Sequence, residues 1–324
     1  MERRLTRENL AGVWAAIATP FDAHDHFDED VFRENVRRLH GAGVHGIYTT
    51  DSDGEFYAIE LDEFRRIVDV FADEAERLGA LTQVGVTWSH TQLMLDRLKY
   101  VAARGILGAH VGHPFFMPMT PRSYAAFWSD IEGAVPDWFA LIHYNTPRVH
   151  NTQRGPDYAL LQSRLPNLIG TKHVGSDVGE FLSLISEAPA LVHFTGEHVF
   201  TPFVFLGARG IYSWFANFNP RYLLDWWDLM QRGCWEDARA RQLRFQAFMR
   251  AATALHEDGN LHGIVGKALT AASDFLVPSN RTRRPYLPVS EYTIAAFRHT
   301  VEESFPDLLW QGEKHELQPF ESAI

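Results

Sequence analysis

The sequence predicts an α/β protein, a (β/α)8 TIM barrel followed by a C-terminal helical appendage. Short apolar runs recur with amphipathic segments between them, a pattern typical of parallel βα units. Eight such runs occur within roughly the first 220 residues, which fits a barrel of about 250 residues. No linker-like stretch divides the chain.

The expected strands are the eight apolar runs at 13–19, 44–50, 80–87, 108–113, 139–145, 168–174, 191–196 and 210–216. The segments between them are expected to be helices. In the segment 62–78, for example, apolar residues recur at a spacing of about 3.6 residues. After residue 220 the strand pattern stops and the remaining segments indicate helices. We therefore expect the barrel over 1–220 and, in the same structural unit, the last barrel helix with C-terminal helices over 221–324.

Composition limits the possible partners. With 324 residues, 46% hydrophobic and 22% charged, the chain is a globular protein. A net charge of −11 argues against binding to nucleic acid or to an anionic membrane. A single cysteine, Cys234, excludes an internal disulfide and fits a reducing compartment. The N-terminus carries no apolar signal region, and no stretch of ~18 apolar residues follows. We expect a cytoplasmic protein that binds small molecules.

One lysine stands out among the residues at the strand ends, where a barrel carries its active site. Lys172 interrupts an apolar strand, and an unpaired ammonium in a core costs several kcal/mol. The chain has only four lysines, so solubility is left to arginine. Alternation along the strand puts Lys172 on the same face as Gly170, with Thr171 and His173 on the other. Gly170 is expected to leave space at the barrel axis.

A buried lysine can act as a nucleophile. Burial disfavours the ammonium and is expected to lower the pKa of Lys172, so that the free amine can attack a ketone. The resulting protonated imine is an electron sink that needs no metal or other cofactor. Tyr144, at the end of the neighbouring strand, is the candidate proton carrier. The alternative is a structural lysine that pairs with a carboxylate across the barrel.

Five motifs in order carry a family resemblance: AAIATPF (15–21), DGEFYAIELDE (53–63), YNTP (144–147), IGTK (169–172) and GARGIYSWFAN (207–217). With them the chain resembles the dihydrodipicolinate synthases and N-acetylneuraminate lyases, which are class I pyruvate aldolases. The resemblance implies that Lys172 forms a Schiff base with pyruvate or another 2-oxo acid, and that Tyr144 relays protons. It also implies an aldehyde as second substrate and a homodimer or homotetramer.

The chain departs from this family in the loop after the second strand. Where the family has G-T-T-G-E, this chain has Asp51-Ser52-Asp53-Gly54-Glu55. Ser52 keeps a hydroxyl, but Asp53 replaces the residue that contacts the substrate carboxylate, and two anions repel. Either the ligand differs, or Asp53 turns away and backbone N–H groups bind the carboxylate. We favour the second arrangement.

Two further departures argue against a typical dihydrodipicolinate synthase. Phe116 stands where the synthases carry a tyrosine, and it cannot relay a proton. Arg148 lies one position earlier than the arginine that follows the synthases' Y-N-x-P motif. The candidate substrate-binding residues are therefore Thr19, Ser52, Asp53, Gly54, Phe116, Tyr212 and Trp214.

Aromatic residues near the strand ends suggest an apolar or aromatic substrate portion. The segments 114–137 and 283–297 are similar to the hydratase-aldolase branch, which acts on aryl-substituted unsaturated 2-oxo acids. We therefore expect a lyase, a class I aldolase or dehydratase that forms or consumes pyruvate plus an aldehyde. The alternatives are 4-hydroxy-tetrahydrodipicolinate synthase, a non-catalytic 2-oxo acid sensor, and a metal-dependent hydrolase or class II aldolase using His113, His173 and His198 with Glu55 and Glu197.

Overall fold

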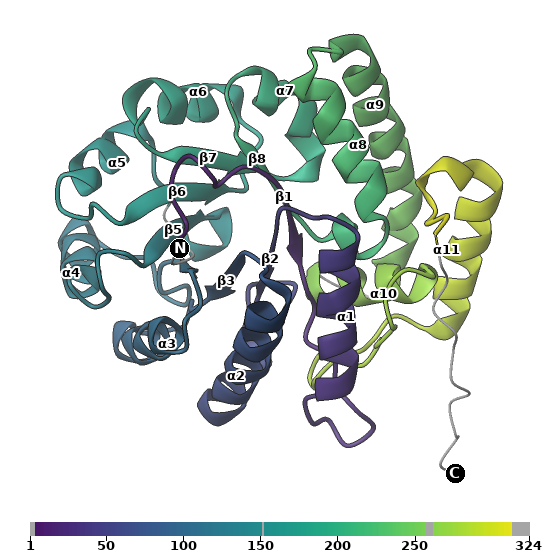
Figure 1. The fold of residues 1–324 in the computed structure, drawn as a ribbon, viewed down its shortest axis with the longest axis horizontal. Coiled ribbons are helices and arrows are strands. Elements are labelled where there is room, and N and C mark those ends of the chain that lie inside the picture. The colour runs from purple at the N-terminus through teal and green to yellow at the C-terminus, as the bar shows by residue number, and fades with distance from the viewer. Residues whose placement is uncertain (1–3, 151, 257–261, 313–324) are drawn as a thin grey trace.

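Eight parallel strands form a closed barrel, in agreement with the expected fold class. The computed structural model describes residues 4–150, 152–256 and 262–312. Each strand pairs with the next along the chain, and β8 closes the barrel on β1 (Figure 1). The strands are β1 Gly12–Ala16, β2 Gly46–Thr49, β3 Thr82–Gly85, β4 Gly108–Val111, β5 Ala140–Asn145, β6 Leu168–His173, β7 Val192–Thr195 and β8 Gly210–Ser213. All eight expected strands are confirmed, each within the run that predicted it or one residue before it.

Helices surround the barrel and alternate with its strands (Figure 1). They are α1 Glu29–Gly41, α2 Leu61–Leu78, α3 Thr91–Ala103, α4 Pro121–Ile131, α5 Gly155–Gln162, α6 Val178–Glu187, α7 Phe200–Phe205 and α8 Pro220–Gln231. The expected helix over 62–78 is α2. Asp28, Thr120, Asp177 and Asn219 begin four of the helices by accepting a hydrogen bond from a backbone N–H of the first turn.

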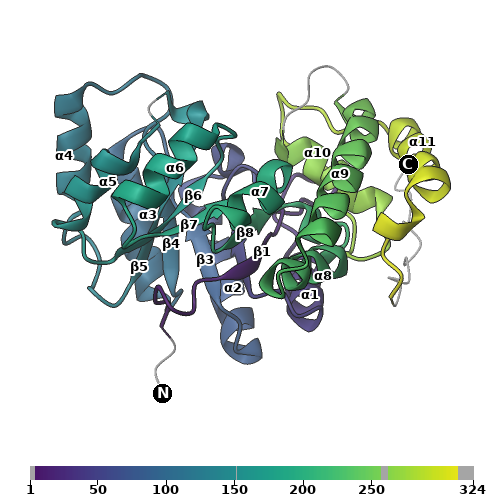
Figure 2. The same cartoon turned by 90° about the horizontal axis from the view of Figure 1, so that it is seen from above.

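Three more helices follow the barrel: α9 Trp235–Ala252, α10 His262–Ala272 and α11 Glu291–Ser304. Figure 2 shows them beside α8 at one end of the molecule, while α4, α5 and α6 lie at the other. Aromatic rings join α9 to the turn after β8: the ring centroid of Phe215 lies 5.0 Å from that of Phe245 and 5.4 Å from that of Phe248. The C-terminal helices thus pack against the rim on which the strands end. None of the helices in the described ranges is both long and apolar enough to cross a membrane.

Side chains from the segment before β1 help to fill the barrel interior. Leu5 and Leu10, which precede β1, pack inside the barrel with the inward-facing side chains of the strands, including Trp14 and Phe194. A Cβ on Gly170 would lie 2.7 Å from the carbonyl oxygen of Val192 and 3.2 Å from a methyl carbon of Leu10. The expectation that Gly170 leaves space at the axis is therefore wrong, because Leu10 occupies that space and the glycine allows close approach of β6 and β7.

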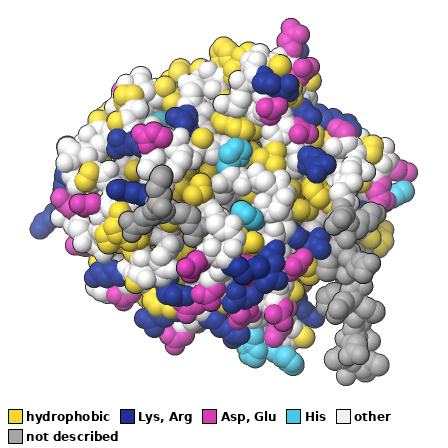
Figure 3. Space-filling view, viewed as in Figure 1, with side chains coloured by type: hydrophobic (Ala, Val, Ile, Leu, Met, Phe, Trp, Pro, Cys, Tyr) yellow, Lys and Arg dark blue, Asp and Glu magenta, His cyan; other side chains and the backbone are white. Residues whose placement is uncertain are grey.

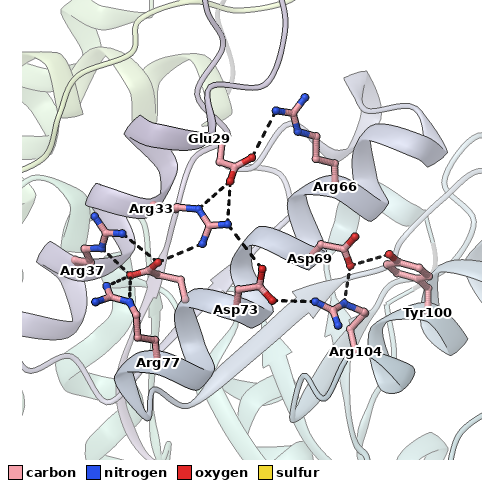
Figure 4. Close-up of polar contacts among 10 residues, drawn as sticks. Glu29, Arg33, Arg37, Arg66, Asp69, Asp73, Arg77, Tyr100 and Arg104 are labelled. Carbon is pink, nitrogen blue, oxygen red and sulfur yellow. Dashed lines mark hydrogen bonds and ion pairs between the residues drawn. The ribbon is translucent and has the colours of Figure 1, made fainter.

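Ion pairs between acidic and arginine side chains connect the first helices (Figure 4). Glu74 of α2 accepts hydrogen bonds from Arg37 Nε at 2.7 Å, Arg33 Nη1 at 3.3 Å and the guanidinium of Arg77. Acidic and basic side chains also lie interspersed where α1 and α2 reach the surface (Figure 3). Although burial raises the pKa of a carboxyl group, the guanidinium groups hold the pKa of Glu74 below its ordinary value of 4.5.

Replacing this carboxylate is expected to destabilise the fold. Glu74→Gln removes the charge that Arg33 and Arg37 share and should lower the free energy of unfolding by about 1–3 kcal/mol at neutral pH, measured by urea unfolding. Because the folded-state pKa is depressed, the stabilisation is complete above the ordinary pKa and disappears as the pH falls through the folded-state value. The difference between wild type and variant should therefore shrink in acid. Glu76→Gln, at an exposed position of the same helix, is the control; an equal loss in both variants would contradict the prediction.

Candidate active site

A cavity of about 650 Å³ opens at the C-terminal ends of the strands, where the sequence predicted the active site. Its wall combines strand ends with the C-terminal helices. Lys172 and Tyr144 lie on it, together with Ser52, Asp53, Arg148, Glu197, His198, Tyr212 and Trp214. Phe245 and Met249 of α9 and Val265 and Gly266 of α10 complete it on the other side. The helices that follow the barrel therefore form part of the candidate active site.

Lys172 is buried and ion-paired. Its Nζ donates hydrogen bonds to Asp51 Oδ2 at 2.7 Å and to the Tyr48 hydroxyl at 3.2 Å. The rings of Tyr144 and Tyr48 flank it, with centroids 4.2 and 4.4 Å from Nζ. Burial alone would lower the pKa of Lys172, but the Asp51 carboxylate, with Tyr144 and Asp53 nearby, raises it above its ordinary 10.5. The expected lowering of this pKa is therefore wrong, because the lysine has the carboxylate partner that the alternative interpretation foresaw.

Asp51 joins the lysine to a row of polar side chains inside the barrel. Asp51 Oδ2 also lies 2.6 Å from His110 Nδ1, and His110 Nε2 lies 2.6 Å from Gln83 Oε1. The Tyr212 hydroxyl donates to the same Gln83 oxygen at 2.8 Å. Although burial raises the pKa of a carboxyl group, Lys172 and His110 lower that of Asp51 to about 2. Asp51 is therefore a carboxylate at any pH at which the protein works.

A glycine on the next strand makes room for Asp51. A Cβ on Gly85 of β3 would lie 2.1 Å from Asp51 Oδ1 and 2.5 Å from the carbonyl oxygen of Thr50. No side chain can occupy position 85 while Asp51 keeps this position. Sequence reasoning missed Asp51, Tyr48 and His110. The signal was present in Asp51, which stands where the family loop has its first glycine.

Tyr144 lies opposite Lys172 across the β5–β6 ladder. Its hydroxyl is 3.2 Å from Ser52 Oγ. The structure therefore brings together Lys172, Tyr144 and Ser52, three of the expected site residues. The hydroxyl that directly contacts Nζ is that of Tyr48. Two tyrosines therefore lie at the amine, one as expected from the Y-N-x-P motif and one from β2.

Asp53 faces the cavity. It lies on the cavity wall with Lys172, and its carboxyl is close enough to Lys172 and Arg148 for their charges to act on it. The favoured arrangement, in which Asp53 turns away, is therefore wrong. Gly266 of α10 lies beside it, where a Cβ would be 3.6 Å from Asp53 Oδ1. Burial, with the Asp51 charge nearby, raises the pKa of Asp53 to about 6.

Three of the expected substrate-binding residues lie off the cavity wall. Thr19 Oγ1 donates to the Gly54 carbonyl oxygen at 2.8 Å, and this bond anchors the loop after β2 to the chain after β1. A Cβ on Gly54 would lie 2.5 Å from the backbone nitrogen of Thr50, so this glycine allows the loop to turn tightly. Phe116 is 78% exposed and points outward. Thr19 and Gly54 thus have a supporting role, whereas Tyr212 and Trp214 line the cavity as expected.

Two charged residues on the wall were not among the candidates for substrate binding. Glu197 accepts a hydrogen bond from Ser213 Oγ at 2.6 Å, and burial raises its pKa to about 6. Arg148, one position early by the family pattern, nevertheless reaches the cavity. Within the described ranges, no three His, Cys, Asp or Glu side chains are arranged to hold a metal ion, and His113 packs against the ring of Trp128.

A second cavity of about 240 Å³ lies next to the first, and Ser52, Tyr144 and Arg148 line both. Its wall is largely aromatic. The ring centroid of Phe56 is 5.7 Å from that of Phe115, and the ring centroid of Tyr57 is 5.2 Å from that of Tyr286. Val149 and Ile264 add aliphatic surface. Of two adjacent phenylalanines, Phe115 lines this cavity, whereas Phe116, the one expected to bind substrate, does not.

Comparison with known proteins identifies relatives along most of the chain. A model of the dihydrodipicolinate synthetase family matches residues 9–304. The N-acetylneuraminate lyase of Rhizobium meliloti (strain 1021) is 28% identical over 308 residues, which cover 93% of this chain and 97% of the relative. The 4-hydroxy-tetrahydrodipicolinate synthase of Methanospirillum hungatei JF-1 is 27% identical over 248 residues, covering 74% of this chain and 83% of the relative.

Solved structures share the fold. A prophage protein of the dihydrodipicolinic acid synthase family from E. coli K12, in complex with pyruvate, has a TM-score of 0.82 at 18% identity, with 90% of this chain and 98% of that chain covered. A catalytic lysine mutant of the Ruminococcus gnavus sialic acid aldolase has a TM-score of 0.83 at 17% identity, with 95% and 100% covered.

The barrel, the buried lysine at its rim and these relatives define the class: the protein is an enzyme, a lyase of the class I aldolase type. The chain belongs to the dihydrodipicolinate synthetase family.

The ion pair with Asp51 predicts an unusual titration of Lys172. Because the chain has four lysines, lysine labelled with ¹³C at Cε should give few NMR signals, which single Lys→Met variants can assign. The Lys172 signal should have its titration midpoint above 10.5, since the neighbouring carboxylate favours the ammonium. A midpoint below 10.5 would show that burial outweighs the carboxylate.

Proposed function

We propose that the protein is a class I aldolase or dehydratase that acts on a 2-oxo acid through a Schiff base on Lys172, forming or consuming pyruvate and an aldehyde. The observation that carries this proposal is the position of Nζ, which is buried on the cavity wall between two tyrosine rings. The aldolase and synthase relatives support it.

Each step has a group in place to perform it. The amine attacks the ketone carbon, water leaves, and the iminium draws electrons from the adjacent bonds, so that a C3 proton, a C–C bond or a C–O bond can break. Tyr144, in contact with Ser52, carries protons between the reacting oxygen atoms and the cavity. The aromatic rings around Nζ stabilise the cation and exclude water.

The acid must bind through its carboxylate, and the cavity offers two groups for it. Arg148 supplies a guanidinium, the side chain best suited to a planar anion. Asp53, with a pKa of about 6, is partly protonated near neutral pH, and a protonated carboxyl donates a hydrogen bond as a threonine hydroxyl would. The replacement of threonine by Asp53 is thus compatible with a 2-oxo acid.

Trapping tests the Schiff base. Incubation with pyruvate and sodium borohydride should add the reduced pyruvate to the protein, and peptide mapping should place it on Lys172. Lys172→Met should remain unlabelled, whereas Lys99→Met, which changes an exposed helix residue, should label as wild type does.

Labelling of wild type alone would not separate an enzyme from a 2-oxo acid sensor. An enzyme should also exchange the methyl protons of pyruvate with D₂O, which proton NMR follows, because the enamine forms and is reprotonated. A wild-type protein that saturating pyruvate leaves unlabelled contradicts the proposed function, and labelling without exchange favours the sensor.

The aromatic cavity supports an apolar or aryl group on the aldehyde, as in a hydratase-aldolase. An aldehyde that meets a pyruvate enamine on Lys172 must reach past Tyr144 and Ser52, and these two residues also line the aromatic cavity. Rings in such a cavity favour edge and offset contacts with another ring. A lysine-biosynthetic substrate, which is polar, would leave these rings unused.

Substrate preference tests this part of the proposal. With pyruvate, kcat/KM for benzaldehyde-type acceptors should exceed that for small polar aldehydes by about tenfold or more, which corresponds to roughly 1.4 kcal/mol. Phe115→Ala should abolish most of this preference and leave pyruvate trapping intact. Phe116→Ala is the matched control, because it removes the same side chain from the exposed neighbouring position. A preference for polar aldehydes in wild type would favour the synthase alternative.

A further inference from the structure

We infer that Asp51 is a catalytic carboxylate: it removes a proton from Lys172 to start imine formation and returns that proton through the lysine nitrogen as water leaves. This inference rests on the proposed function, since it concerns the same Schiff base. It assigns a role to a residue that the family loop, with a glycine at this position, does not contain.

The first argument is the position of Asp51 relative to the amine. Its Oδ2 lies 2.7 Å from Nζ, the shortest contact that the lysine makes in the described structure, while the cavity wall is formed by Lys172 itself and by Tyr48 and Tyr144. Asp51 therefore lies behind the amine, away from the space where a 2-oxo acid binds. It can exchange a proton with Nζ without repelling the substrate carboxylate.

The second argument is that the surroundings hold Asp51 in place. His110 Nδ1 contacts the same Oδ2 at 2.6 Å, and burial lowers the pKa of His110, so the neutral ring donates Nδ1–H to the carboxylate. His110 Nε2 then needs a donor. The Gln83 amide supplies one if its nitrogen and oxygen, which are similar in shape, are exchanged; the Tyr212 hydroxyl then accepts from the same nitrogen instead of donating. That exchange also gives a partner to Gln83 Nε2, which otherwise has none in the described structure.

The third argument concerns energy. Lys172 and Asp51 are 5% and 1% exposed, and keeping two opposite charges out of water is costly. Transfer of a proton from Nζ to Asp51 leaves two neutral groups and removes this cost. At rest the attraction between the two charges keeps the proton on Nζ, so Asp51 holds it only while the nitrogen lone pair attacks the ketone. The other titratable groups that face the pair are Tyr48, Asp53, Tyr144 and Tyr212. Burial raises the pKa of Tyr48 and that of Tyr212, so these two hydroxyl groups add no competing charge.

The protons balance. Asp51 takes one proton from the ammonium, the nitrogen lone pair forms the C–N bond, and the carbonyl π pair moves to oxygen. That oxygen receives two protons through Tyr144 and leaves as water. One comes from the carbinolamine nitrogen and the other is the proton held by Asp51, returned through the same nitrogen. The net change converts the ammonium and the ketone into an iminium and water, and Asp51 is again a carboxylate beside a cation.

The pH dependence of imine formation tests this role. Rates are measured with pyruvate by stopping the reaction with borohydride after short delays and weighing the intact protein. In wild type the rate at saturating pyruvate, where binding through Asp53 no longer limits it, should be nearly constant from about pH 6 to 9, because the base is internal and remains ionised. In Asp51→Asn the solvent must remove the proton, so the rate should fall about tenfold per pH unit below the pKa of the amine, and by about 10²-fold at pH 7.

A purely structural or inhibitory ion pair predicts a different result. Asp51→Asn would then release the amine and speed labelling at neutral pH, or leave the rate and its pH profile unchanged. Either outcome overturns the inference. Asp69→Asn is the control, since it removes a carboxylate that Arg104 contacts at 2.6 Å on the outer helices and should keep the wild-type profile.

The wild-type profile decides the question even if Asp51→Asn fails to fold. A wild-type rate that rises tenfold per pH unit up to the pKa of Lys172 shows that no internal base acts, and overturns the inference while the proposed function stands. A wild-type protein that is never labelled overturns the proposed function and this inference with it.

Discussion

The ion pair between Lys172 and Asp51 is the interaction on which the candidate active site depends. It places two charges in the buried interior of the barrel, above a layer of apolar and aromatic side chains, where neither would be stable alone. Its presence explains other choices in the sequence. Position 85 must be glycine because Asp51 Oδ1 occupies the space of a side chain. His110, which Gln83 contacts on its other nitrogen, supplies a polar contact that the buried carboxylate requires.

The barrel makes this pair possible because it brings together residues that are distant in sequence. Asp51 follows β2 and Lys172 ends β6, on opposite parts of the closed sheet, and their side chains meet across the axis. The strands alone leave the rim open. The C-terminal helices α9 and α10 complete the cavity with Phe245, Met249 and Val265, so the segment after the barrel shapes the space above the lysine.

Sequence reasoning predicted the strands, α2 and the place of Lys172 and Tyr144 at the strand ends, because each depends on local periodicity or on a motif within a few residues. It failed where the outcome depends on packing between distant segments. The Lys172 pKa depends on a partner across the barrel, and the orientation of Asp53 depends on its place between the barrel rim and α10. The expectation for Phe116 failed because a loop without regular alternation does not reveal which of two adjacent side chains faces inward. Gly170 was misjudged because Leu10, from before the first strand, fills the axis.

The ion pair also sets the charge of the rest of the cavity. Lys172 carries one positive charge, and its ion-pair partner is Asp51, whose Oδ2 lies 2.7 Å from Nζ. Asp53 and Glu197 are therefore buried carboxyl groups without a full counter-charge, and burial raises the pKa of each to about 6. Near neutral pH they are partly protonated and can donate hydrogen bonds. An acidic site of this kind is compatible with an anionic substrate, because the ionised Asp51 lies behind the lysine and the two carboxyl groups on the cavity wall can be protonated.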